Sequence, residues 1–170
     1  PVQNLYQTLK IFYEQYSAGI VPGYKNRTER ALFATLRSSL YEHAEFYPRQ
    51  FALKKDDRGR LFETVRHEGV GQSFVSSTRP QSTRGNHYHA RKLERFMVLE
   101  GEAEITMRKL FTMNVRRFRV TGEGPVYIDM PSFYTHAIQN TGTEDLTTLF
   151  WTDEMFDAND PDTYAEPVFL

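Results

Sequence analysis

The chain has 170 residues, of which 39% are hydrophobic and 14% aromatic, and its formal net charge at pH 7 is −1. This composition allows one folded domain with a small appendage, and the near-neutral charge argues against nucleic acid as a partner. There is no cysteine, which excludes disulfides and thiolate metal sites and fits a cytoplasmic protein. No apolar run approaches the roughly 20 residues that span a bilayer, so we expect no membrane partner.

The first 45 residues are predicted to form two helices. Apolar residues recur at helical spacing until Pro22-Gly23, a pair that ends helices. Asn26 and Glu29 have the spacing of a capping box for the second helix. The predicted apolar faces are Leu5, Leu9, Phe12 and Tyr16 in the first helix, and Ala31, Leu32, Leu36 and Leu40 in the second.

From about Leu61 the apolar residues alternate with polar ones, as in β-strands with one face in water. The predicted strands are Leu61–Arg66, Ser73–Thr78, Phe96–Leu99, Ala103–Arg108, Val115–Val120, Val126–Met130, Tyr134–Gln139 and Leu146–Trp151. Many short strands at regular spacing are typical of a sandwich or barrel. The acidic, turn-rich segment Met155–Tyr164 is predicted to be an ordered tail lying over this barrel.

Four potential metal ligands follow an informative pattern. His87 and His89 are two residues apart, so on a strand they project from the same face, while Glu94 opens the next apolar run. With the distant His136 they supply three imidazoles and one carboxylate, a set that suits Zn, Fe, Mn or Ni and can leave a coordination position open. We therefore predict a divalent metal, zinc first, on His87, His89, Glu94 and His136. The alternative is that these histidines are hydrogen-bonded barrel residues without a metal.

These residues resemble the two motifs of the cupin superfamily. The matching positions are His87, His89, Glu94 and Gly101 in the first motif, and Pro131, His136 and Asn140 in the second. Phe133 and Gln81 stand where the family has glycines, which puts the turns in question but not the ligands. The resemblance implies a mainly β fold, the cupin double-stranded β-helix or jelly roll, with a short N-terminal helical extension.

A second resemblance concerns cupins that process nucleotide-linked 4-keto-6-deoxy sugars. Its elements are Asp57-Arg58-Gly59 with Glu63, and Arg84-Gly85-Asn86-His87. It implies that His87 occupies the position of a catalytic base and that Arg84 contacts an anion. His87 cannot be both a firm metal ligand and a free base. Arg84 would reach the pocket only if Gly85 breaks the alternation of the strand.

Further side chains are expected to serve such a substrate. A diphosphate needs positive charge near the pocket mouth, and we predict Arg66 and Lys92 as substrate-binding residues beside Arg84. Epimerisation needs a proton delivered to the opposite face of the reacting carbon. Tyr134 shares the strand face of His136, and we predict it as a catalytic residue together with His87.

Taken whole, the chain resembles the C-terminal part of the bifunctional capsular polysaccharide enzymes of the CapF/WbjC type. The shared stretches include Ala31-Leu32-Phe33, Asp129-Met130-Pro131 and Trp151-Thr152-Asp153-Glu154-Met155-Phe156-Asp157. The resemblance implies that residues 1–47 are the end of a missing short-chain reductase domain plus a linker, and that residues 48–170 are the cupin domain. It implies C3 epimerisation of a UDP-2-acetamido-2,6-dideoxy-4-keto-hexose, in the synthesis of the UDP-N-acetyl-L-fucosamine precursor of capsular polysaccharide or O-antigen.

The reductase half of that activity is not expected here. The sequence has no Gly-rich nucleotide loop, so we expect no NADP in this chain. By analogy with other cupins we expect a homodimer. The alternatives are a 3,4-ketoisomerase of a nucleotide sugar, a metal-dependent dioxygenase, and a non-catalytic sugar-binding or dimerisation module with a structural metal.

Overall fold

The computed structural model describes residues 2–43, 46–124 and 126–170, so residues 44–45 of the expected helical region lie outside the description. Two helices precede a run of strands. Their bounds are α1 Val2–Ser17, α2 Arg27–Tyr41, β1 Lys54–Asp56, β2 Gly59–His67, β3 Gly71–Thr78, β4 Thr83–Tyr88, β5 Glu94–Glu100, β6 Glu102–Lys109, β7 Val115–Thr121, β8 Tyr127–Met130, β9 Tyr134–Asn140, β10 Leu146–Thr152 and β11 Tyr164–Ala165.

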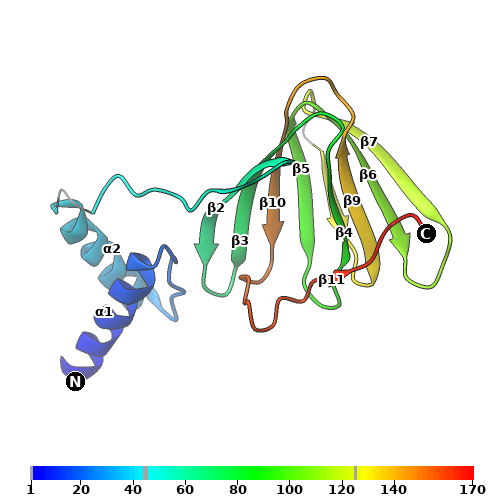
Figure 1. Cartoon of the computed structure of the whole chain (residues 1–170). Coiled ribbons are helices and arrows are strands. Elements are labelled where there is room, and N and C mark those ends of the chain that lie inside the picture. Colours follow the sequence, from blue (N-terminus) through cyan, green and yellow to red (C-terminus); the bar gives the residue numbers. More distant parts are fainter. Residues whose placement is uncertain (1, 44–45, 125) are drawn as a thin grey trace.

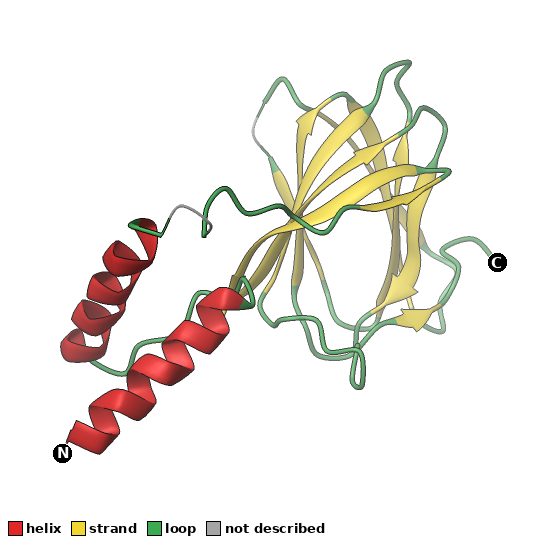
Figure 2. Ribbon diagram, turned by 60° about the vertical axis from the view of Figure 1, so that its left-hand side comes forward, coloured by secondary structure: helices red, strands yellow, loops and turns green. Residues whose placement is uncertain are grey.

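The strands form two antiparallel sheets that face each other, as Figures 1 and 2 show. One sheet has the order β1-β2-β3-β10-β5-β8, and the other β11-β4-β9-β6-β7. Apolar side chains from both sheets meet between them. This core consists of Phe96, Val98, Ala103, Ile105, Met107, Met130, Ile138, Leu146 and Phe150. The mainly β fold with a helical extension, expected from the sequence, is confirmed.

All eight predicted strands are present, but three others had no apolar alternation to reveal them. The three residues of β1 are all exposed. The two residues of β11 gain their strand geometry only by pairing with β4. The sequence of β4, Thr-Arg-Gly-Asn-His-Tyr, is mostly polar, and its Arg84 and His87 line a cavity rather than the core.

The helical pair has its own small core. Asn26 caps α2 as predicted, since its side chain accepts the Glu29 backbone N–H at 2.9 Å, but the Glu29 carboxylate accepts the backbone N–H of Lys25, one residue before the cap. The predicted face of α2 needs one correction. Phe33 is the most buried residue of the pair and packs edge-on against Phe12, whereas Ala31 is exposed.

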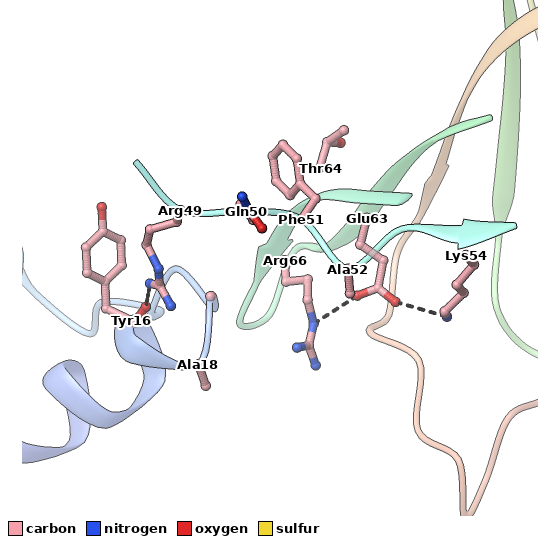
Figure 3. A pocket seen from close by; sticks show the side chains of 11 residues that line it. Tyr16, Ala18, Arg49, Gln50, Phe51, Ala52, Lys54, Glu63, Thr64 and Arg66 are labelled. Carbon is pink, nitrogen blue, oxygen red and sulfur yellow. Dashed lines mark hydrogen bonds and ion pairs between the residues drawn. The ribbon is translucent and has the colours of Figure 1, made fainter. Parts of the chain in front are cut away.

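The helical extension is attached to the end of β2. Val21 donates its backbone N–H to the Arg66 carbonyl and accepts the backbone N–H of Glu68, which forms a short parallel bridge with His67. A cavity of about 360 Å³ lies where the extension and the connecting segment approach the barrel. Figure 3 shows Arg49, Phe51, Lys54, Glu63 and Arg66 around it. No helix of the described residues is long and apolar enough to cross a membrane.

A β-bulge in β4 decides which side chains face the same cavity. Gly85 has φ +103° and Asn86 φ +58°, and the register with β9 shifts between Gly85 and His87. The bulge breaks the two-residue alternation, so Arg84 and His87 line one cavity although they are three residues apart. The condition under which Arg84 reaches the pocket, a break of the alternation at Gly85, is therefore met.

Both missing motif glycines are replaced by residues in the glycine conformation. Phe133 has φ +63° and Gln81 φ +62°, in the left-handed region. Each residue is held in a turn by its backbone, since Phe133 N–H donates to His89 and Gln81 N–H to Asn140. The turns therefore survive the substitutions, at a conformational cost of roughly 1–2 kcal/mol for each side chain.

Gly85→Ala should destabilise the barrel strongly. A Cβ at this position would lie 2.6 Å from the carbonyl oxygen of His136 and 2.8 Å from the Cα of Ala137. We expect a loss of at least about 2 kcal/mol in the free energy of unfolding, measured by urea titration. Gly69→Ala is the matched control, because its φ of +75° is similar but nothing lies within 4 Å of the added Cβ. Equal losses in the two variants would contradict the close approach.

Phe133→Gly should stabilise the protein by up to about 1 kcal/mol, because glycine adopts positive φ without strain. Phe133 is largely exposed, so little burial is lost. Met113→Gly, at an exposed position without positive φ, is the control and should not be stabilising. A Phe133→Gly variant that loses as much stability as Met113→Gly in thermal melting would count against strain at this turn.

Candidate metal centre

The four predicted ligands come together at one point between the sheets. His87 and His136 face each other across the β4–β9 pair, His89 follows β4, and Glu94 opens β5 in the opposite sheet. One ligand atom from each residue lies within 4.8 Å of the ligand atoms of the other three. His89 and His136 are buried. The arrangement therefore has the ligand types and the compactness of a mononuclear metal site.

The hydrogen bonds around Glu94 show that these residues fit a cation. The Nε2 atoms of His89 and His136 both lie 3.1 Å from Glu94 Oε2. Their Nδ1 atoms lie 2.7 Å from the carbonyl oxygen of Asp162 and 3.2 Å from that of Tyr134, respectively. If Nδ1–H donates to each carbonyl, the two Nε2 atoms either carry a second hydrogen, which makes the rings cationic and lets them donate to Glu94, or offer their lone pairs to a cation. Positive charge is then needed among them, and a divalent metal ion supplies it.

The electrostatics of Glu94 favour its charged form. Burial alone would raise its pKa, but hydrogen bonds with His136 and His89 outweigh the burial and hold the pKa of Glu94 well below its ordinary value. A carboxylate that stays ionised is the state required of a metal ligand.

His87 differs from the other two histidines. Among the described residues its ring has no hydrogen-bond partner, whereas His89 and His136 are each held on both ring nitrogens. Burial, and then the nearby His136, lower the pKa of His87 to about 4. His87 is therefore neutral at pH 7, and it is the least constrained member of the cluster.

Two adjoining cavities open onto the cluster, and His87, Glu94 and Phe74 line both of them. The smaller, of about 140 Å³, is bounded by Lys92 and the tail after β10. The larger, of about 350 Å³, is lined by Arg84, Arg58 and an apolar wall. The apolar wall consists of Leu61, Phe74, Phe96, Ile138 and Phe150. Together they offer a ligand an apolar surface, two guanidinium groups and the histidine cluster.

Two of the three predicted substrate-binding cations lie at these cavities. Arg84 is half-buried, donates to Thr78 Oγ1 at 3.1 Å and lies 3.6 Å from Asp56. Burial lowers the pKa of Arg84, although the charge of Asp56 opposes the shift, and a guanidinium stays protonated in proteins. The Lys92 ammonium donates to Pro161 O and Thr163 Oγ1 at 2.8 and 2.9 Å.

The other two predicted residues lie away from the cavities at the cluster. Arg66 lines the cavity beside the helical extension and lies 3.5 Å from Glu63 (Figure 3). Tyr134 shares the strand face of His136, as expected, but packs against the apolar core, and the residues that line the two cavities do not include it. The geometry thus gives no support to Arg66 as a substrate contact, and the role of Tyr134 stays a prediction.

The tail after β10 supplies residues to which the sequence analysis gave no role in the site. The segment was expected to lie over the barrel, and it does line the smaller cavity. Its cavity-lining residues are Glu154, Met155, Phe156, Pro161 and Thr163. Asp162 contacts both His89 and the turn that follows it. The sequence signals for Asp162 were its place in the turn-rich tail and in a stretch shared with the resembled family, and neither indicates what the residue contacts.

Comparison with known proteins identifies the family. Residues 54–164 match the model of the polysaccharide biosynthesis C-terminal domain. A curated relative from Pseudomonas aeruginosa, UDP-2-acetamido-2,6-β-L-arabino-hexul-4-ose reductase, is 35% identical over 136 residues. That alignment covers 80% of this chain but only 36% of the relative, so the chain spans about a third of its length.

Solved structures agree with this family and with the fold. The capsular polysaccharide assembling protein CapF from Staphylococcus aureus matches with a TM-score of 0.83 and 33% identity, over 94% of this chain and 43% of that protein. A Bacillus subtilis oxalate decarboxylase with Mn(II) centres matches in fold alone, with a TM-score of 0.54 and 16% identity, over 68% of this chain and 30% of that protein. The chain therefore belongs to the polysaccharide biosynthesis C-terminal domain family, and within it is a cupin domain of the CapF type.

Proposed function

We propose that this domain is a nucleotide-sugar C3-epimerase acting on a UDP-2-acetamido-2,6-dideoxy-4-keto-hexose. The observation that carries the proposal is one unconstrained, neutral imidazole, His87, beside a cation-binding cluster and at the junction of two cavities. The substrate class is supported by the name of the Pseudomonas aeruginosa relative, whose reductase acts on a UDP-linked 4-keto sugar. Because the chain spans only part of that relative, the shared substrate is part of the proposal.

His87 takes the role of base in this reaction. A proton on C3 is acidic because C4 is a ketone, and its removal leaves the electron pair of the C–H bond on the ketone oxygen as an enolate. His87 is neutral and has no competing hydrogen bond among the described residues, so it is free to accept that proton. Return of a proton to the opposite face of C3 inverts the centre, and Tyr134 stays the predicted donor.

His89, Glu94 and His136 hold the divalent metal in this proposal, with zinc first and Fe, Mn or Ni as alternatives. Two imidazoles and a carboxylate are a recognised open-sided ligand set. The bound ion would supply positive charge close to the enolate oxygen. His87, which the sequence also predicts as a metal ligand, is left free in this proposal to act as the base.

The remaining parts of the substrate would be bound by the cations of the cavities. Arg84 lies in the larger cavity, where its guanidinium can contact a diphosphate in bidentate fashion. Lys92 lies in the smaller cavity and uses two of its three N–H donors on the tail, which leaves one for the sugar. The homodimer expected for this domain also stays a prediction.

Proton exchange at C3 tests the proposal directly. Incubation with the UDP-4-keto-6-deoxy amino sugar in D2O should place deuterium at an inverted C3, followed by NMR and mass spectrometry. His87→Asn should slow this exchange at least about 100-fold, because a general base typically contributes that much or more. His43→Asn, at an exposed position far from the cluster in sequence, should leave the rate unchanged.

The outcomes of this experiment distinguish the proposed epimerase from the alternative functions. Labelling without inversion but with a carbonyl moved to C3 would indicate a 3,4-ketoisomerase instead. No exchange by a folded, metal-loaded protein would favour a sugar-binding module. Exchange by His87→Asn at the rate of the unchanged protein would remove His87 from the mechanism.

Metal addition should stabilise the protein through Glu94. After treatment with a chelator, zinc at about 100 times its dissociation constant should raise the free energy of unfolding by about 2.7 kcal/mol. Glu94→Gln removes the ligand charge and should lose most of this gain in a thermal-shift titration. Glu100→Gln, at the exposed far end of β5, is the matched control and should keep it. An equal gain in both variants would place the metal elsewhere.

A further inference from the structure

The tail after β10 folds onto the short turn that joins His89 to Glu94. Asp162 is the centre of this contact, and only 2% of its surface is exposed. Its carboxylate accepts hydrogen bonds from three consecutive backbone N–H groups, those of residues 90–92, at 2.9–3.1 Å. Three such donors fix the conformation of a turn whose two ends carry metal ligands.

The backbone of Asp162 makes a second contact with the same site. Its carbonyl oxygen lies 2.7 Å from Nδ1 of His89. A carbonyl can only accept, so this bond requires a hydrogen on Nδ1 and leaves Nε2, which faces Glu94, as the ring atom that can bind a metal. Asp162 has φ +41°, an unusual conformation for a residue with a side chain, and its four hydrogen bonds compensate for that strain.

Neighbouring contacts tie the tail to the rest of the centre. Lys92, in the same turn, donates to the residues on either side of Asp162, Pro161 and Thr163. Two residues after Asp162 the tail enters β11, in which Ala165 pairs with His87. The tail is therefore connected to the surroundings of three of the four clustered side chains.

We propose that Asp162 is a positioning residue of the metal centre. It sets the tautomer of His89, the orientation of the His89 ring, and the distance between His89 and Glu94. The inference rests on the metal site of the proposed function. Partners that orient a metal-bound imidazole in this way typically change metal affinity about 10- to 100-fold when they are replaced. The effect of Asp162 should therefore appear in metal binding, before any question of catalysis.

Asp162→Asn tests this role with little change in volume. An amide places N–H groups where the backbone donors need an acceptor, so the turn should loosen and zinc affinity, measured by competition with a chromogenic chelator, should fall about 10- to 100-fold. Asp160→Asn is the matched control, because Asp160 lies in the same tail and pairs with Arg91 but bonds neither His89 nor the N–H groups of the turn. It should keep the affinity of the unchanged protein.

A spectroscopic signature separates positioning from a merely structural role. In the metal-free protein, imidazole ¹⁵N shifts should show His89 with a hydrogen on Nδ1, and Asp162→Asn should weaken that preference while the far-UV circular dichroism stays native. If Asp162→Asn does not fold, Asp162→Gly also removes the carboxylate and relieves the positive φ, and it should show the same loss of affinity.

The outcomes distinguish this inference from the function on which it rests. If the unchanged protein binds no divalent metal, the proposed metal site fails. If it binds zinc and Asp162→Asn or Asp162→Gly binds equally tightly, only the role of Asp162 is overturned. A hydrogen found on Nε2 rather than Nδ1 of His89 in the metal-free protein would overturn it as well.

Discussion

One carboxylate joins the two sheets at the centre of this molecule. Glu94 comes from the six-stranded sheet, and its Oε2 atom lies 3.1 Å from imidazoles attached to the other sheet at His89 and His136. Burying a carboxylate beside imidazole lone pairs is unfavourable unless a cation or added protons compensate for the negative charge. The polar centre of the barrel is therefore stable only in a form that carries positive charge.

The cavities follow from this constraint. A jelly roll filled entirely with apolar side chains would have no room for a ligand, but here the histidine cluster takes the place of core residues next to Phe96. The bulge at Gly85 then directs Arg84 to the same side as His87. An apolar wall, a cation and the cluster come to surround one space because of a single irregular strand.

The sequence predicted the parts of this arrangement that depend on local periodicity or on spacing along one strand. Alternating apolar residues located the central strands, and the two-residue spacing of His87 and His89 placed them on one face. Contacts that depend on how distant segments pack were beyond such reasoning. Arg66 could not be placed, because nothing local shows which of two cavities the end of β2 faces. Phe33 is likewise more buried than Ala31 because of the way α1 packs against α2. The apolar pattern of one helix does not specify how a second helix packs against it.

The contact between the tail and the metal centre has a consequence for the order of events in the cell. His89 and Asp162 are separated by 73 residues, and the ribosome synthesises the chain from His89 toward Asp162. A nascent chain already carries His87, His89 and Glu94 when the tail has not yet emerged. Metal captured at that stage would be held by a loose, solvent-open set of ligands and would exchange readily with the cellular pool. In the proposed metal site, the ligand geometry would therefore be complete only after Asp162 has docked onto His89 and the turn that follows it.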